Sequence, residues 1–248
     1  MPHPGLRASY AEAYTSMGMT AENVARKYEV SRREQEVFAA ESQRKAAQAA
    51  TGGRFDDEIV PIKVGDRTIS RDGCIRPDTT PEILAALKPV FLAGGTVTAG
   101  VSSPLTDGAS AVLVCSERYA RDKGLDIMAR IRSAAVSGCS PEIMGMGPVA
   151  STNKALQRAS LTLEDMDVIE INEAFAAQAL AVVKELGVDQ SKLNLDGGAV
   201  ALGHPLGASG ARITGKAASL LKREGGRYAL ATMCIGGGQG IATVLEAI

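Results

Sequence analysis

The chain has 248 residues, enough for one large domain or two smaller ones, with 45% hydrophobic and 22% charged residues. Its formal net charge of −1 excludes the global basic field that nucleic-acid and membrane-surface proteins use. It contains no apolar run long enough to span a bilayer, and its four cysteines show neither metal-ligand spacing nor the pattern of a disulfide framework. We therefore expect a protein of a reducing, cytoplasmic compartment that binds no metal, nucleic acid or membrane.

The first part of the chain, residues 1–95, is polar and helical at first and irregular afterwards. Ser31 and Glu34 have the spacing of a capping box, which predicts a long helix that ends near Gly52. Residues 55–64 could form a strand, but only at the edge of a sheet, because Pro61 cannot donate a ladder hydrogen bond. Since this segment cannot bury a large core by itself, we expect it to lie on another part of the molecule as a lid.

From residue 96 onward the pattern changes to alternating strands and helices. Two short segments, 96–100 and 109–115, predict a strand hairpin. Further strands are expected at 129–136, 166–171, 193–195, 228–234 and 241–246, and helices at 116–123, 151–159, 172–186 and 209–224. Such alternation is typical of an α/β fold, a sheet covered by helices, which here ends in an antiparallel hairpin.

Two candidate site residues follow predicted strands, where sites in α/β folds tend to form. Asn172 ends one strand and opens a helix, so it is either a helix cap or a site residue. His204, one of two histidines in the chain, stands between Gly203 and Pro205 in a glycine-rich turn. A histidine held beside donor-rich backbone suits acid/base or oxyanion chemistry, but an ordinary turn with a solvated histidine has the same pattern.

A third candidate, Cys234, ends the penultimate strand just before the glycine run at 236–238. Free cysteine is more often a small buried residue than a reactive one. The successive amides of the glycine run can favour a thiolate, so a reactive Cys234 with a lowered pKa is the second interpretation. The chain contains no G-x-x-x-x-G-K-[ST] sequence, so this run is not a phosphate-binding P-loop.

Three separated motifs resemble those of the thiolases, the acetyl-CoA acyltransferases and acetyltransferases. They are Asn-Glu-Ala-Phe-Ala at 172–176, Gly-His-Pro at 203–205 and Cys-Ile-Gly-Gly-Gly at 234–238. Segments 17–23, 96–100 and 107–109 match in the same order, so the resemblance covers nearly the whole chain. It implies a thiolase-like α/β fold and an acyltransferase of lipid metabolism. Such an enzyme cleaves a 3-ketoacyl-CoA with CoA or runs the reverse Claisen condensation.

The resemblance also implies a role for each matching residue. His204 would activate the nucleophile and, with a water held by Asn172, stabilise the thioester oxyanion. Cys234 would be the acid/base at the α-carbon, and the backbone N–H of Gly236 would help form a second oxyanion hole. Positions that match the CoA and acyl-pocket residues of the family are Ser103, Met144 and Phe175. Coenzyme A is a substrate in this chemistry, so no cofactor is expected.

The chain departs from the family pattern because it lacks the nucleophile, a cysteine in the N-terminal half of thiolases. Its other cysteines, at 74, 115 and 139, match different parts of the family. The resemblance therefore divides the chain into a loop domain at 1–95, a remnant of the N-terminal half at 96–126 and a C-terminal domain at 127–248, with the N-terminal half missing.

Two functional interpretations follow from this departure. In the first, the chain is a thiolase fragment that is inactive alone, has the missing half as its partner and forms a homo-oligomer when complete. In the second, it is a non-catalytic module that binds acyl-CoA or a thiolase partner. Ser16 stands where acetoacetyl-type biosynthetic enzymes have a histidine, which favours a degradative or broad-range thiolase.

Overall fold

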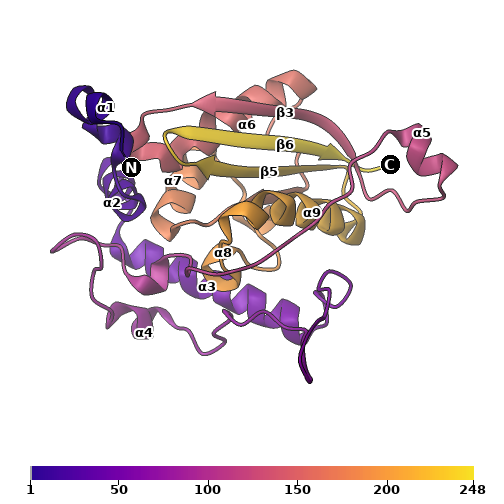
Figure 1. Cartoon of the computed structure of the whole chain (residues 1–248), viewed down its shortest axis with the longest axis horizontal. Helices are drawn as coiled ribbons and strands as arrows, with labels where there is room; N and C mark the ends of the chain where they lie inside the picture. The colour runs from indigo at the N-terminus through magenta and orange to yellow at the C-terminus, as the bar shows by residue number, and fades with distance from the viewer. Residues whose placement is uncertain (1) are drawn as a thin grey trace.

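A four-stranded sheet forms the centre of the computed structural model, which describes residues 2–248 (Figure 1). The strands lie in the order β3 (Arg130–Gly138), β6 (Gln239–Glu246), β5 (Tyr228–Ile235) and β4 (Val168–Ile171). β4 is parallel to β5, whereas β5 and β6, and β6 and β3, are antiparallel. The predicted α/β fold and its closing antiparallel hairpin are therefore confirmed.

Helices cover both faces of this sheet. One face packs against α6 (Gly147–Ala159) and α7 (Ala176–Leu186), and the other packs against α9 (Leu206–Glu224). β4 is buried along its whole length, and its side chains alternate between the two cores: Val168 belongs to the α9 side and Ile169 to the α7 side. Both faces of the carboxyl end of β4 are thus closed by packed helices.

The segment before residue 96 wraps around the C-terminal part of the chain. Its elements are α1 (Pro4–Ser9), η1 (Ala11–Tyr14), α2 (Met17–Lys27), α3 (Arg32–Thr51), β1 (Ile62–Val64), β2 (Arg67–Ile69) and α4 (Pro81–Ala85). α3 starts at the predicted capping box, in which the Ser31 hydroxyl and the Glu34 carboxylate each accept from the other's backbone N–H. It packs against α7 and α8 (Ala199–Leu202), as expected for a lid that lies on another part of the molecule.

The strand hairpin predicted for 96–100 and 109–115 is wrong. The first segment contains a 3₁₀ turn, η2 (Ala99–Val101), and residues 103–115 are extended without pairing to any strand of the described chain. This segment crosses α8 and α9 toward α5 (Glu117–Asp122), as Figure 1 shows. Leu113 is 74% exposed there, so its apolar side chain has no core to enter. A strand pattern becomes a strand only where another strand satisfies its backbone.

Other predicted boundaries also differ. The strand expected at 55–64 is replaced by the exposed hairpin β1–β2, and the one at 193–195 is reduced to a single bridge between Leu193 and Ile169. Asn172 is not a helix cap, because α7 begins four residues later with Phe175 as its N-cap. The remaining short helices are η3 (Pro141–Met146) and η4 (Gln190–Lys192).

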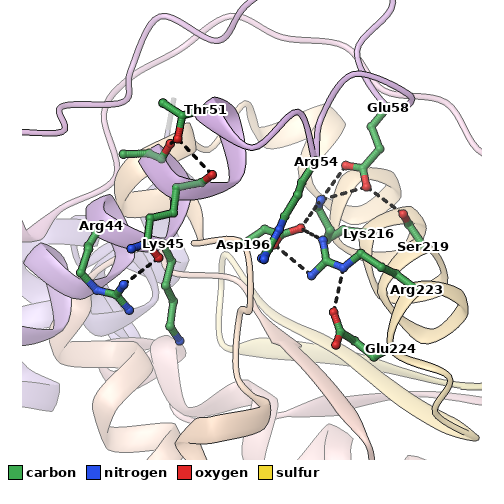
Figure 2. A network of polar contacts seen from close by, with 12 residues as sticks. Arg44, Lys45, Thr51, Arg54, Glu58, Asp196, Lys216, Ser219, Arg223 and Glu224 are labelled. Atoms are coloured by element: carbon green, nitrogen blue, oxygen red, sulfur yellow. Dashed lines mark hydrogen bonds and ion pairs between the residues drawn. The ribbon is translucent and has the colours of Figure 1, made fainter.

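An ion network fastens the loop after α3 to α9 (Figure 2). The Asp196 carboxylate, which is fully buried, accepts from Lys216 at 3.0 Å, Arg223 at 2.7 Å and Arg54 at 3.2 Å. Lys216, also buried, forms a second ion pair with Glu58 at 2.7 Å. Arg54 and Glu58 belong to the N-terminal part of the chain, so this network joins that part to the helix that follows His204.

Candidate active site

The carboxyl end of β4 and the turn before α9 bring Asn172 and His204 together. The Asn172 backbone N–H donates to the Thr232 carbonyl at 3.0 Å, which extends the β4–β5 pairing by one residue. This bond fixes the Asn172 backbone, and the side-chain Nδ2 lies 3.3 Å from Nε2 of His204. The structure thus joins two of the three residues that the motifs singled out.

Each ring nitrogen of His204 has one hydrogen-bond partner. Nδ1 lies 2.5 Å from the Ser209 hydroxyl, and that hydroxyl donates to the Pro205 carbonyl at 3.0 Å. Because the hydroxyl has a single proton, it accepts from Nδ1–H of the histidine. The Asn172 amide nitrogen can only donate, so Nε2 accepts from it. This pattern assigns the proton to Nδ1 and leaves the lone pair of Nε2 facing Asn172.

The surroundings of His204 favour the neutral ring. Burial lowers the pKa of His204, and the positive charge of Arg212 lowers it further. A histidine with a pKa below its usual value of about 6.5 is uncharged at neutral pH and can act as a base. The ring is half-buried and bonded at both nitrogens, which excludes the interpretation as a solvated histidine in an ordinary turn.

A single glycine is required where the chain enters this turn. Gly203 has a φ of +95°, and a Cβ at this position would lie 2.7 Å from the Thr106 hydroxyl. The segment at 103–115 therefore lies directly against the turn, and Ser110 fastens it by donating to the Ala208 carbonyl at 2.6 Å. The exposed extended segment thus helps to hold the start of α9 beside the histidine.

Cys234 lies at the same edge of the sheet, two residues beyond Thr232 on β5. Its thiol is buried and, within residues 2–248, forms no hydrogen bond with Asn172 or His204. A shared pocket that includes Cys234 therefore stays a prediction. Burial raises the pKa of Cys234 to about 12, and the charge of Cys139 acts in the same direction.

The expectation that the glycine run lowers the pKa of Cys234 is therefore wrong. The backbone amide of Cys234 itself favours the thiolate, but burial outweighs it. Gly238, with a φ of +87°, turns its carbonyl to accept from the Cys139 N–H. A Cβ at Gly236 would meet no atom within 4 Å, so open space lies beside this residue. The glycine run thus forms a turn that has open space beside Gly236 and is held at Gly238 by Cys139.

The residues expected to contact substrate lie near the start of α7. Ser103 donates from both its N–H and its hydroxyl to the Ala174 carbonyl, each at 3.0 Å. Phe175 makes an edge-to-face contact with Phe91, with ring centroids 6.0 Å apart. Met144 is buried in η3, which packs against α7. Ser103 thus contacts the residue before Phe175, and Met144 lies on an element that packs against α7.

Two residues beside the candidate site, Ser209 and Phe91, lie outside the three family motifs. Ser209 lies five residues after His204 in the same glycine-rich stretch. Its position in the first turns of the following helix is the sequence feature that could have identified it. Phe91 lies in an irregular segment without any periodic pattern, and only its packing on Phe175 and Gly18 identifies it. A Cβ at Gly18 would lie 2.1 Å from the Phe91 ring.

Among residues 2–248, no group of three or more His, Cys, Asp or Glu side chains is arranged to hold a metal ion. Over the same range, every helix is too short or too polar to cross a bilayer.

Two protein-family models match the chain. The model described as thiolase, N-terminal domain, matches residues 3–118, and the model described as thiolase, C-terminal domain, matches residues 125–247. Because the N-terminal model also matches, the expectation that the N-terminal half is missing is not supported.

Similar proteins carry the same family name. The chain is 53% identical over 253 residues to the 3-ketoacyl-CoA thiolase of Vibrio cholerae serotype O1, which covers 98% of this chain and 65% of that protein. Its identity to the 3-ketoacyl-CoA thiolase of Aliivibrio fischeri is also 53%, with the same coverage. The chain therefore spans 65% of the length of these curated relatives.

Solved structures agree with this assignment. Human mitochondrial 3-ketoacyl-CoA thiolase superposes with a TM-score of 0.92 at 48% identity, covering 98% of this chain and 63% of the human chain. The same human enzyme in complex with CoA gives a TM-score of 0.90 at 47% identity over 96% of this chain and 60% of the other. Together with the three ordered motifs and the sheet that positions them, these matches show that the chain belongs to the thiolase family.

Proposed function

We propose that the chain is the acid/base and CoA-binding part of a 3-ketoacyl-CoA thiolase that works in the cleavage direction of fatty-acid β-oxidation. The observation that carries this proposal is the hydrogen-bonded series of Asn172, His204 and Ser209 at the end of β4. It holds a neutral imidazole with its basic nitrogen beside a side-chain amide donor. A neutral imidazole with Nε2 unprotonated can take the proton of a nucleophilic thiol.

The thiol Cys234 supplies the other half of the proton chemistry. In thiolysis, His204 takes the proton of a nucleophilic cysteine, whose thiolate attacks the 3-keto carbonyl. The carbon–carbon bond then breaks, and the electron pair leaves on the acetyl-CoA α-carbon, which Cys234 protonates. Because burial raises the pKa of Cys234 to about 12, its thiol holds this proton at neutral pH. The Cys234 thiolate next takes the proton of the CoA thiol, and the CoA thiolate attacks the acyl group. The nucleophilic cysteine leaves and regains its proton from His204, which restores both residues.

We assign substrate binding to residues near the start of α7 and in η3. Ser103 donates to the Ala174 carbonyl, its neighbour Ser102 forms a bridge with Phe175 just before α7, and Met144 comes from η3. We assign Ser103 to the pantetheine chain, and Phe175 and Met144 to the acyl group. The related human enzyme in complex with CoA supports a CoA site in this chain.

None of the four cysteines has surroundings that suit the nucleophile. Burial raises the pKa of Cys74 and of Cys139, and nearby carboxylates raise both further. Cys115 is exposed, and no hydrogen bond in residues 2–248 joins it to a base. Cys234 has the proton-donor role. We propose that another thiolase segment supplies the nucleophile and that the chain alone does not turn over, since losing one member of a catalytic unit costs about 10⁴-fold or more.

Thiolysis of acetoacetyl-CoA tests this proposal. The chain is purified alone and after co-expression with a thiolase segment that carries the family's nucleophilic cysteine. We expect no turnover from the chain alone and thiolysis from the pair. Ordinary thiolase rates from the chain alone would mean that one of its own cysteines is the nucleophile, which iodoacetamide labelling would identify. CoA binding by calorimetry without thiolysis from either preparation would instead support the non-catalytic CoA-binding module.

A further inference from the structure

Glu173 follows Asn172 directly and is only 1% exposed. Its carboxylate accepts from the Ser42 hydroxyl at 2.7 Å, the Asn194 amide Nδ2 at 2.7 Å and the Val200 backbone N–H at 3.1 Å. Burial raises the pKa of Glu173, and these hydrogen bonds act in the opposite direction. Its partners therefore come from three elements: α3, the turn after η4 and α8.

Asn194 connects the same carboxylate to the end of β4. Its Oδ1 accepts from the Ile171 N–H at 2.9 Å, and its Nδ2 donates to the Ile171 carbonyl at 3.0 Å as well as to Glu173. Asn194 has a φ of +43°, a left-handed conformation that asparagine tolerates better than most residues. Both the residue before Asn172 and the residue after it are thus held by one turn.

The space around the carboxylate is closed. A Cβ at Gly198 would lie 2.1 Å from the carboxylate carbon of Glu173, and the Gly198 N–H donates to the Ser42 hydroxyl at 3.0 Å. The Glu173 carboxylate and Gly198 therefore cannot move independently of each other. The three hydrogen bonds thus hold the carboxylate in one place.

We propose that Glu173 is a positioning residue that sets the distance between Asn172 and His204. The connection is a closed circuit: Glu173 is bonded covalently to Asn172, its carboxylate holds Val200, and α8 leads from Val200 to Gly203 and His204. The hydrogen bond between Asn172 and His204 then closes the circuit at 3.3 Å. The catalytic importance of this distance rests on the proposed function, whereas the geometry does not.

Replacing Glu173 by glutamine breaks the circuit with minimal change in volume. Asn194 and Val200 both present N–H donors to the carboxylate, one to each oxygen. Whichever way the new amide turns, its –NH₂ group faces a donor, and a buried donor without an acceptor costs about 1–3 kcal/mol. If the –NH₂ group faces Val200, the turn that leads to His204 is pushed away from Asn172. If it faces Asn194, the turn that holds Ile171, the residue before Asn172, is displaced instead.

The chain itself provides the readout, because it has two histidines and His3 is exposed. With ¹⁵N-histidine labelling, NMR titration follows both rings in wild type and in Glu173→Gln. We expect the His204 pKa to rise toward about 6.5 as the ring leaves its buried position, with loss of the single Nδ1–H tautomer, while His3 is unchanged. The charge of Arg212, which faces His204, remains in every variant.

Glu36→Gln is the matched control, because Glu36 is 3% exposed on α3 and pairs with Arg32 at 2.8 Å. It removes a buried carboxylate without touching the circuit and should leave the titration of His204 unchanged. A folded Glu173→Gln variant with wild-type His204 pKa and tautomer would overturn the proposal. If that variant does not fold, Ser42→Ala decides in the same way, since it removes the hydroxyl between Gly198 and Glu173. A shifted titration without any thiolysis from the paired chains would refute the proposed function and keep the positioning role.

Discussion

The ion network at Asp196 gives the most direct energetic prediction. Asp196→Ala leaves Lys216, which is almost fully buried, without one of its two carboxylate partners. Removing one partner of a buried ion pair costs about 3–5 kcal/mol. Lys216 keeps Glu58 at 2.7 Å and Arg223 keeps Glu224 at 2.7 Å, so we expect the lower end of this range. At an m-value of about 3 kcal/mol/M, a loss of about 3 kcal/mol lowers the urea midpoint by about 1 M.

Urea unfolding followed by circular dichroism measures this loss, and Asp126→Ala is the control. Asp126 pairs with Lys222 on the same helix α9, but both side chains are exposed, so little change is expected. Burial opposes the ionised form of Asp196, but Arg223 and Lys216 outweigh burial and lower its pKa. Its contribution is therefore complete above about pH 3.9 and is lost as the pH falls through the lower folded pKa. Equal midpoints for wild type and Asp196→Ala at pH 7 would refute the structural role of the network.

Three further changes test separate parts of the structure. Ser209→Ala removes the acceptor of His204 Nδ1–H, so ¹⁵N NMR should show a mixture of ring tautomers; an unchanged tautomer would contradict the assigned hydrogen bond. Glu170→Gln removes a buried carboxyl group, whose pKa is raised to about 8 by burial. Because ionising this group in the folded state is unfavourable, the wild type loses stability as the pH rises. The variant should therefore gain in urea midpoint over wild type between pH 5 and pH 8, and a constant difference would exclude this explanation. Ser31→Ala removes the capping box of α3 and should cost about 1 kcal/mol with faster amide exchange in the first turn of α3; unchanged exchange there would show that the cap is unimportant.

Local chemistry made several elements predictable from sequence. The capping box of Ser31 and Glu34 sets the start of α3 because a side chain three residues away satisfies the free N–H groups of the helix. The hairpin of β5 and β6 was predictable because two strand-length apolar runs flank a glycine-rich turn. In both cases the interacting residues are neighbours in the sequence.

Features that depend on distant partners were not predictable. Residues 109–115 have a strand composition, but whether they form a strand depends on a neighbouring strand elsewhere. The pKa of Cys234 depends on its burial in the folded chain, which outweighs the favourable contribution of its own backbone amide. Within the site, the motifs identified Asn172 and His204, whereas Glu173 acquires its role only when α3, α8 and the turn at Asn194 meet.

The central claim is that His204 is the base that activates the nucleophile. Its most direct test is the rate of acetoacetyl-CoA thiolysis by the chain paired with a cysteine-bearing thiolase segment, measured for wild type and His204→Gln at equal CoA occupancy. Loss of the positioned base should lower the rate by about 10²–10⁴-fold with little change in CoA affinity. A His204→Gln rate within a few-fold of wild type would contradict the assignment.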